Sequence, residues 1–152
     1  MKLVKNLSLA ETELKKFFSK LTIVEGKKDK DVLSKLGFSN IITINGQPIF
    51  AVVEKAKSQN PESVSILTDF DKEGERQASE LARIFQKNQS AINQSIRFKI
   101  KHMLNVKKIE EIRYFTKLLY YAEVANLSHD KALNRKLFIQ KVARNKKINQ
   151  KT

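Results

Sequence analysis

Ser65-Ile66-Leu67-Thr68-Asp69-Phe70-Asp71-Lys72-Glu73-Gly74-Glu75-Arg76 is the stretch that decides the fold of this chain. An apolar run stops at Asp69, a second carboxylate follows at Asp71, and a glycine and a helix-forming segment come next. Two like charges beside a buried strand repel each other and resist desolvation, and a bound cation removes that cost. Hard cations with oxygen ligands, Mg²⁺ above all, suit such a pair. The alternative is that both aspartates only cap the next helix.

A second acidic strand end lies 44 residues earlier, in Leu21-Thr22-Ile23-Val24-Glu25-Gly26-Lys27-Lys28-Asp29. This stretch is another short apolar run that ends in a carboxylate, Glu25, and a glycine. The interval to Asp69 has room for a helix, a strand and another helix, and this alternation predicts a parallel sheet with right-handed crossovers. If the first and third strands are neighbours, about 4.8 Å apart, their carboxylates share one rim.

Together the two stretches resemble the Toprim family, whose pattern is Glu-Gly after the first strand and Asp-x-Asp after the third. The resemblance covers roughly residues 21–101. It implies an α/β, Rossmann-like domain with a parallel four-stranded sheet flanked by helices, here followed by a C-terminal helical extension. It also implies that Glu25, Asp69 and Asp71 are the catalytic residues and the ligands of Mg²⁺, with Mn²⁺ as an alternative ion. The family leaves open whether the glutamate binds the metal or acts as general base or acid.

The Asp-x-Asp stretch is similar to the topoisomerase form of the motif. Asn45-Gly46, after the second strand, looks like the form in the maturase of the smallest ribosomal RNA. The chain also looks like small stand-alone Toprim proteins of archaea. We expect the loops near the site to contain Gly26, Asn45, Gly46 and Gly74. Gly46 would let the backbone approach a ligand closely. A plain turn is the alternative for Gly46.

Apolar periodicity divides the chain into elements. The expected strands cover residues 21–24, 41–44, 64–68 and 95–101, and the expected helices cover about 29–36, 48–56, 75–85, 106–126 and 131–145. Residues 87–94 read as a polar loop. The segment 95–101 alternates apolar and basic residues, which predicts an edge strand whose basic face guards the edge or also contacts phosphate.

Four segments follow from this pattern. We expect an N-terminal helix packed on the domain in residues 1–20 and the Toprim core in 21–101. A basic helical extension is expected in 102–145, and a basic tail in 146–152 that is disordered until it meets nucleic acid.

Positive charge dominates the composition, with 30 Lys and Arg against 16 Asp and Glu and a net charge of +14. Residues 1–92 carry +3 and residues 93–152 carry +11. Such asymmetry points to a polyanionic partner, nucleic acid above all, and a solvated basic surface is the alternative. Without cysteine and with two distant histidines, the chain lacks the residues of a disulfide framework or a cysteine-rich zinc site. It has no apolar run long enough to span a membrane, so we expect a cytoplasmic protein without a membrane partner.

Basic side chains flank the acidic motifs and are the candidate phosphate contacts. They are Lys27, Lys28, Lys72, Arg76, Arg97, Lys99 and Lys101. A solvated charge is the alternative for each of them. The resemblance, together with the basic helical extension, implies a Mg²⁺-dependent nuclease that acts on structured RNA, such as ribosomal RNA, or on DNA. The alternative is a non-catalytic protein that binds RNA or the ribosome through its basic C-terminal half.

Overall fold

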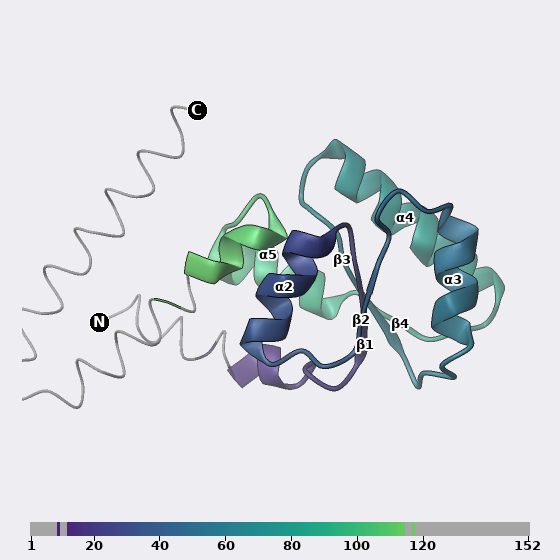
Figure 1. The fold of residues 1–152 in the computed structure, drawn as a ribbon, viewed down its shortest axis with the longest axis horizontal. Helices are drawn as coiled ribbons and strands as arrows, with labels where there is room; N and C mark the ends of the chain where they lie inside the picture. The colour runs from purple at the N-terminus through teal and green to yellow at the C-terminus, as the bar shows by residue number, and fades with distance from the viewer. Residues whose placement is uncertain (1–8, 10–11, 115–116, 118–152) are drawn as a thin grey trace, which may run out of the picture.

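The computed structural model describes residue 9, residues 12–114 and residue 117. Its sheet has four parallel strands in the order β2-β1-β3-β4 (Figure 1). The strands are β1 (Leu21–Val24), β2 (Ile41–Thr43), β3 (Val64–Leu67) and β4 (Ile92–Asn93). The helices are α2 (Lys27–Leu36), α3 (Ile49–Lys57), α4 (Lys72–Lys87), α5 (Ser95–Leu104) and the 3-10 helix η1 (Ile109–Ile112). The predicted α/β class and four-stranded parallel sheet are confirmed.

Strands β1 and β3 are hydrogen-bonded neighbours, which is the arrangement that a shared carboxylate rim requires. Val24 pairs with Leu67 in register, so both strands reach the same rim before the chain turns into the next helix. Every residue of the two strands is buried, which explains why the strands are mostly apolar, with Thr22 and Ser65 as their polar members. The register places the residues that follow each strand, Glu25 and Thr68-Asp69, side by side.

Helices cover both faces of the sheet, and alternate strand residues point into two separate cores. Leu21 and Ile23 pack with the buried residues of α3 and α4. Val24 and Leu67 pack on the other side with α2, α5 and η1. Figure 1 shows α3 and α4 on one side of the strands and α2 and α5 on the other. The result is a doubly wound, three-layer domain.

The predicted strand over 95–101 is wrong, because this segment is the first part of helix α5. Ile96 and Ile100 are four residues apart and fit a helical face as well as a strand face, and Leu104 extends the helical series. Phe98, which the strand interpretation would bury with them, is 64% exposed. The fourth strand is instead the two-residue β4, inside the segment predicted as a polar loop.

The other boundaries differ less. Helices α2 and α4 begin two to three residues before their predicted starts, since Gly26 and Asp71 occupy the N-cap positions. A helix was expected to begin at Val106, but residues 105–108 are irregular and η1 follows them. Residues 113, 114 and 117 of that predicted helix are helical. Its other residues after 112, the helix over 131–145 and the tail over 146–152 lie outside the described residues. The division into four segments therefore stays a prediction. No described helix has the length and apolar character that crossing a membrane requires.

Candidate metal and nucleic-acid site

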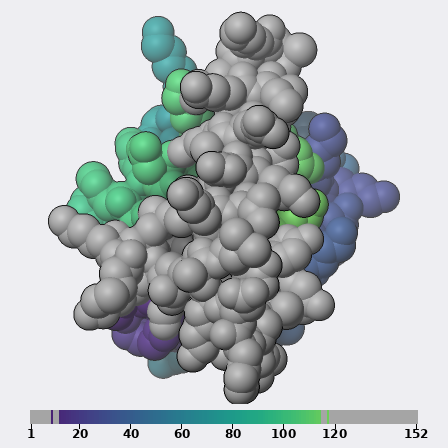
Figure 2. All heavy atoms as spheres, turned by 90° about the vertical axis from the view of Figure 1, so that its left-hand side faces the viewer, coloured from purple at the N-terminus to yellow at the C-terminus, as the bar shows by residue number. Residues whose placement is uncertain are grey.

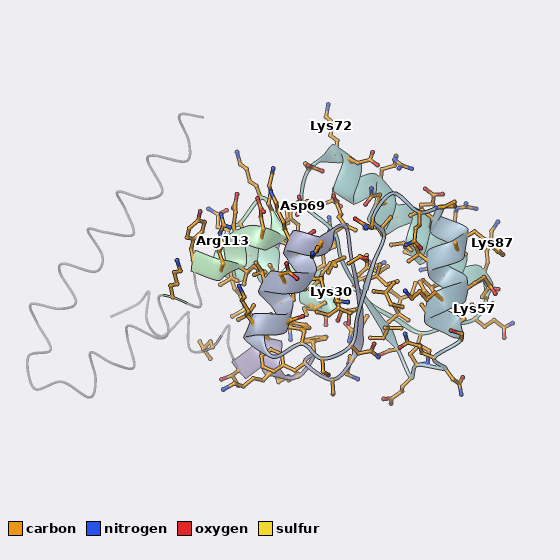
Figure 3. All side chains as sticks on the ribbon, in the orientation of Figure 1. Lys30, Lys57, Asp69, Lys72, Lys87 and Arg113 are labelled. Carbon is orange, nitrogen blue, oxygen red and sulfur yellow. The ribbon has the colours of Figure 1, made fainter. Side chains whose placement is uncertain are left out.

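The structure brings Glu25 and Asp69 together at the carboxyl rim of the sheet. The backbone N–H of Asp69 donates a hydrogen bond of 3.2 Å to Glu25 Oε1, across 44 residues of sequence. The adjoining loop joins the same rim, because the N–H of Asn45 donates to the carbonyl oxygen of Glu25 at 2.8 Å. Figure 3 shows Asp69 at the end of the sheet from which α4 starts, with Lys72 in the first turn of that helix. The predicted shared rim is thus present.

Both aspartates of the Asp-x-Asp motif also accept backbone hydrogen bonds. Asp71 is the N-cap of α4, and its Oδ1 accepts from the N–H of Gly74 at 2.8 Å. Asp69 Oδ1 accepts from the N–H of Ile109 at 2.8 Å, which ties the start of η1 to the motif. The capping interpretation therefore describes Asp71 directly. It does not describe Asp69, whose carboxylate lies between the strand end and the segment after α5.

Asp29 is a further acidic residue at this site that sequence reasoning did not identify as functional. It occupies the third position of α2, and its Oδ2 accepts from the N–H of Gly26 at 3.0 Å. The residue is only 7% exposed, which is unusual for an aspartate. Its spacing of four residues from Glu25 is the signal that could have identified it, because the first turn of a helix points back toward the preceding strand end.

Burial and mutual repulsion disfavour the ionised forms of these carboxyl groups. Burial raises the pKa of Glu25 above its ordinary value, and the nearby charge of Asp69 raises it further. Burial likewise raises the pKa of Asp69, with a smaller contribution from the charge of Asp71. The pKa of Asp29 is raised mainly by burial and also by the charge of Asp69. Crowded, partly desolvated carboxylates are the donor set that a hard divalent cation stabilises.

The rim is not a preassembled cage of side chains. Within the part of the chain that the structure describes, no group of three histidine, aspartate or glutamate side chains has a geometry that could hold a metal ion. Asp69 and Asp71 each accept a backbone N–H group through Oδ1. The second oxygen of each carboxylate keeps its lone pairs for a cation. The donor types therefore fit Mg²⁺.

Gly74 allows α4 to lie directly against the motif. A Cβ atom at this position would overlap the carbonyl oxygen of Asp69 and would lie 2.8 Å from Glu25 Oε1. The hydroxyl of Thr68, itself fully buried, donates to the carbonyl oxygen of Gly74 at 2.6 Å. The first turn of α4 and the Asp-x-Asp loop are thus one packed unit that leaves no room for a side chain at position 74.

Arg97 of α5 contacts the Asp-x-Asp loop from the other face of the sheet than α4. Its guanidinium donates to the carbonyl oxygen and the hydroxyl of Thr68 and, at 2.8 Å, to the carbonyl oxygen of Asp69. Its side chain is 11% exposed, forms an ion pair with Glu75 at 3.1 Å, and lies 4.7 Å from the ring centroid of Phe70. The edge-strand prediction placed this residue on an exposed basic face. The helix instead turns it inward, where it contacts backbone oxygens.

We expect Arg97→Gln to lower the free energy of unfolding by about 2 kcal/mol, because it removes charge-assisted hydrogen bonds to buried oxygens. Urea unfolding followed by circular dichroism measures this change. Lys99→Gln is the matched control, since it removes the same charge from the same helix but breaks a pair with Glu13 instead. A half-exposed pair of that kind contributes less than about 1 kcal/mol. Equal effects of the two variants would contradict the role of Arg97 at the loop.

The remaining predicted phosphate contacts fall into two groups. Lys27, Lys28 and Lys72 are exposed at the helix starts that flank the rim, with no ion pair among the described contacts. Others already have acidic partners. Arg76 pairs with Glu73 and Glu80, and Lys101 lies 3.7 Å from Glu75.

Asn45 and Gly46 are exposed after β2 with positive φ angles of 50° and 75°, as a tight turn requires. Their contacts with nucleic acid stay predictions.

Comparison with known proteins gives three similarities. A UPF0292 protein of Methanocaldococcus jannaschii is 34% identical over 79 residues, which make up 51% of this chain and 62% of that protein. A UPF0292 protein of Pyrococcus furiosus is 44% identical over 64 residues, or 42% of this chain and 48% of that protein. A solved structure of a protein from Aquifex aeolicus has 32% identity and a TM-score of 0.62 over 69% of this chain and 96% of that one.

A doubly wound α/β domain with an acidic carboxyl rim defines the class of protein. The model of the Toprim domain matches residues 20–103, more than half of the chain, so the protein belongs to the Toprim family. The predicted family and the extent of its match are therefore confirmed. The chain spans only 62% and 48% of the two curated relatives' lengths. Family membership associates the chain with metal-dependent processing of nucleic acid.

Proposed function

We propose that the protein is a Mg²⁺-dependent nuclease that hydrolyses phosphodiester bonds in structured RNA, with DNA as the second substrate class. The observation that carries this proposal is the hydrogen bond between the N–H of Asp69 and the carboxylate of Glu25, which joins two acidic strand ends at one rim. A protein that only bound polyanions would gain nothing from partly buried carboxylates, since they repel phosphate. This arrangement favours a site in which a cation lies between protein and phosphate.

Glu25, Asp69 and Asp71 would hold Mg²⁺, or Mn²⁺ in its place. The bound ion would supply charge neutralisation on the phosphate and a more acidic attacking water. The hydrogen bonds from Ile109 to the Asp69 carboxylate and from Arg97 to the Asp69 carbonyl oxygen would keep this ligand in a fixed orientation. Glu25 would either complete the ion's coordination or accept the proton of the attacking water. Its raised pKa is the direction that suits a group that moves a proton near neutral pH.

Basic side chains around the rim would hold the substrate. Lys27, Lys28 and Lys72 lie exposed at the starts of α2 and α4, where the helix dipoles add positive potential. RNA is favoured over DNA because the Asn45-Gly46 loop is similar to that of the ribosomal RNA maturase and because residues 93–152 carry +11. Ribosomal RNA is the proposed structured substrate, and the cytoplasm is the proposed location.

We expect the purified protein with Mg²⁺ to cut structured RNA, and we expect Glu25→Gln to slow that cleavage by at least about a hundredfold. Sequencing of the nucleic acid that co-purifies with the protein supplies the substrate, and gel analysis of the end-labelled strand measures cleavage. Glu62→Gln is the matched control, because Glu62 is exposed just before β3, at the opposite end of the strand. Cleavage that persists in Glu25→Gln would disprove this role.

A non-catalytic binding function is the second candidate. It is favoured by the net charge of +11 on residues 93–152 and by the use of Asp71 as the N-cap of α4. In this case the domain would be a scaffold and the basic C-terminal half would dock on RNA or on the ribosome. The same experiment separates the two candidates, because a binding protein retains its nucleic acid intact in Mg²⁺ whatever residue occupies position 25.

A further inference from the structure

The outward face of helix α5 carries an exposed aromatic pair. Phe98 is 64% exposed, and its ring centroid lies 4.1 Å from that of His102, one helical turn further on. His102 is exposed as well. Figure 2 views the molecule from the side on which α2 and α5 lie, with coloured parts of both near opposite edges. On this helix Ile96, Ile100 and Leu104 are buried and Met103 is partly buried, so Phe98 is the apolar residue of α5 that is exposed.

Lys101 connects this pair to the acidic site. It lies three residues after Phe98 and therefore on the same helical face. Its ammonium is 3.7 Å from Glu75 Oε1 and 5.9 Å from the ring centroid of Phe70, the middle residue of the Asp-x-Asp motif. The side chain of Lys101 thus links the helical face that carries the aromatic pair to the Asp-x-Asp loop. Helix α5 contains no acidic residue, and its Arg and Lys side chains pair with Glu13 and Glu75 of other segments.

We propose that Phe98 and His102 form a stacking surface for unpaired nucleobases of the nucleic acid, with Lys101 on the adjoining phosphate. This inference rests on the proposed function and makes it narrower, because it assigns single-stranded segments to the site. Aromatic side chains beside basic ones are the usual means of binding single strands, since every base presents a π-face whatever its sequence. A continuous duplex hides those faces by stacking them on each other.

The position of this stacking surface would direct a bound strand toward the carboxyl rim. A base stacked on Phe98 would place the next phosphate near Lys101, and the strand would then continue toward the carboxyl rim. Strands with unpaired nucleotides, such as the loops and bulges of structured RNA, can present bases in this way, and double-helical segments cannot. The surface therefore favours cutting beside unpaired nucleotides.

The chain has no tryptophan, so Phe98→Trp introduces a single fluorescent reporter at the proposed surface. We expect a single strand of about 12 nucleotides to quench this fluorescence, and the same strand in a duplex to leave it nearly unchanged. Phe50→Trp is the matched control. Phe50 is 66% exposed but lies on α3, in the layer on the other face of the sheet. Its fluorescence should change little with either probe.

A second variant tests affinity directly. Phe98→Ala should weaken binding of the labelled single strand about tenfold in fluorescence anisotropy and should leave the urea midpoint unchanged, because the ring is exposed. Single-strand binding that is equal in wild type and Phe98→Ala, with no quenching of Phe98→Trp, overturns the stacking surface and leaves the proposed nuclease standing. Loss of self-association in Phe98→Ala, measured by sedimentation, would assign the ring to a contact between copies instead. Failure of wild type to bind any nucleic acid overturns both proposals.

Discussion

Gly74→Ala should lower the free energy of unfolding by about 3 kcal/mol, although it adds a single methyl group. The new Cβ would overlap the carbonyl oxygen of Asp69 and would lie 2.7 Å from its carbonyl carbon. Real Cβ contacts are essentially never shorter than 3.0 Å. The obstacle is backbone rather than the end of a flexible side chain, so relief requires α4 to move away from the loop. Urea unfolding measures the loss.

Gly26→Ala is the matched control for this prediction. Gly26 also lies at the rim, next to Glu25, but its φ of −137° is open to any residue. A Cβ there would meet Asp29 Oδ2 at 3.8 Å, an ordinary contact. We expect a change of less than about 1 kcal/mol, because glycine and alanine differ modestly at an N-cap. If both variants were equally stable, the packing of α4 against the Asp-x-Asp loop would be looser than the structure shows.

The acidic rim could be predicted from sequence because its causes are local. Each of two short, mostly apolar runs ends in a carboxylate, and such runs of four residues are typical of parallel strands covered on both faces. This pattern places Glu25 and Asp69 at strand ends. Their meeting also required β1 and β3 to be neighbours, a condition that the sequence left open and that the register of Val24 with Leu67 meets.

The segment over 95–101 shows where such reasoning fails. Ile96 and Ile100 satisfy a period of two and a helical spacing of four at once, so the pattern alone could not choose. In the helix that forms, Arg97 donates hydrogen bonds to the backbone oxygens of Thr68 and Asp69. Backbone acceptors have no sequence signature. A basic residue that appeared to face solvent is therefore a buried contact of the predicted site.

The loop is also held by residues beyond the part of the chain that matches the family. The N–H of Phe70 donates to the carbonyl oxygen of Lys107 at 2.9 Å, and Ile109 donates to Asp69. Ile109 and Ile112 are buried with α2. Because these contacts come from residues after 103, the C-terminal part of this chain contributes to the geometry of the site and not only to its positive charge.

Asp69→Asn should make the metal-free protein more stable than wild type at neutral pH. The substitution removes a partly buried negative charge, and the amide oxygen of asparagine can still accept the hydrogen bond from Ile109. Burial raises the pKa of Asp69 in the folded state, so its ionisation disfavours folding. That penalty is absent below the unfolded pKa and grows as the pH rises through the folded pKa. The advantage of the variant should therefore shrink in acid, and thermal unfolding at several pH values measures it.

Mg²⁺ should reverse this order of stability. At a concentration about 100 times its dissociation constant, the ion should stabilise wild type by about 2.7 kcal/mol. It should stabilise Asp69→Asn far less, because an amide is a weaker ligand than a carboxylate. Asp31→Asn is the matched control, since Asp31 is exposed on α2 and should leave the metal response intact. Equal stabilisation of all three proteins would place the ion elsewhere. The crowding of carboxylates at this rim predicts that the charge of Asp69 costs stability and is kept because it binds the ion. If Asp69→Asn were less stable than wild type without metal, the carboxylate would instead stabilise the fold.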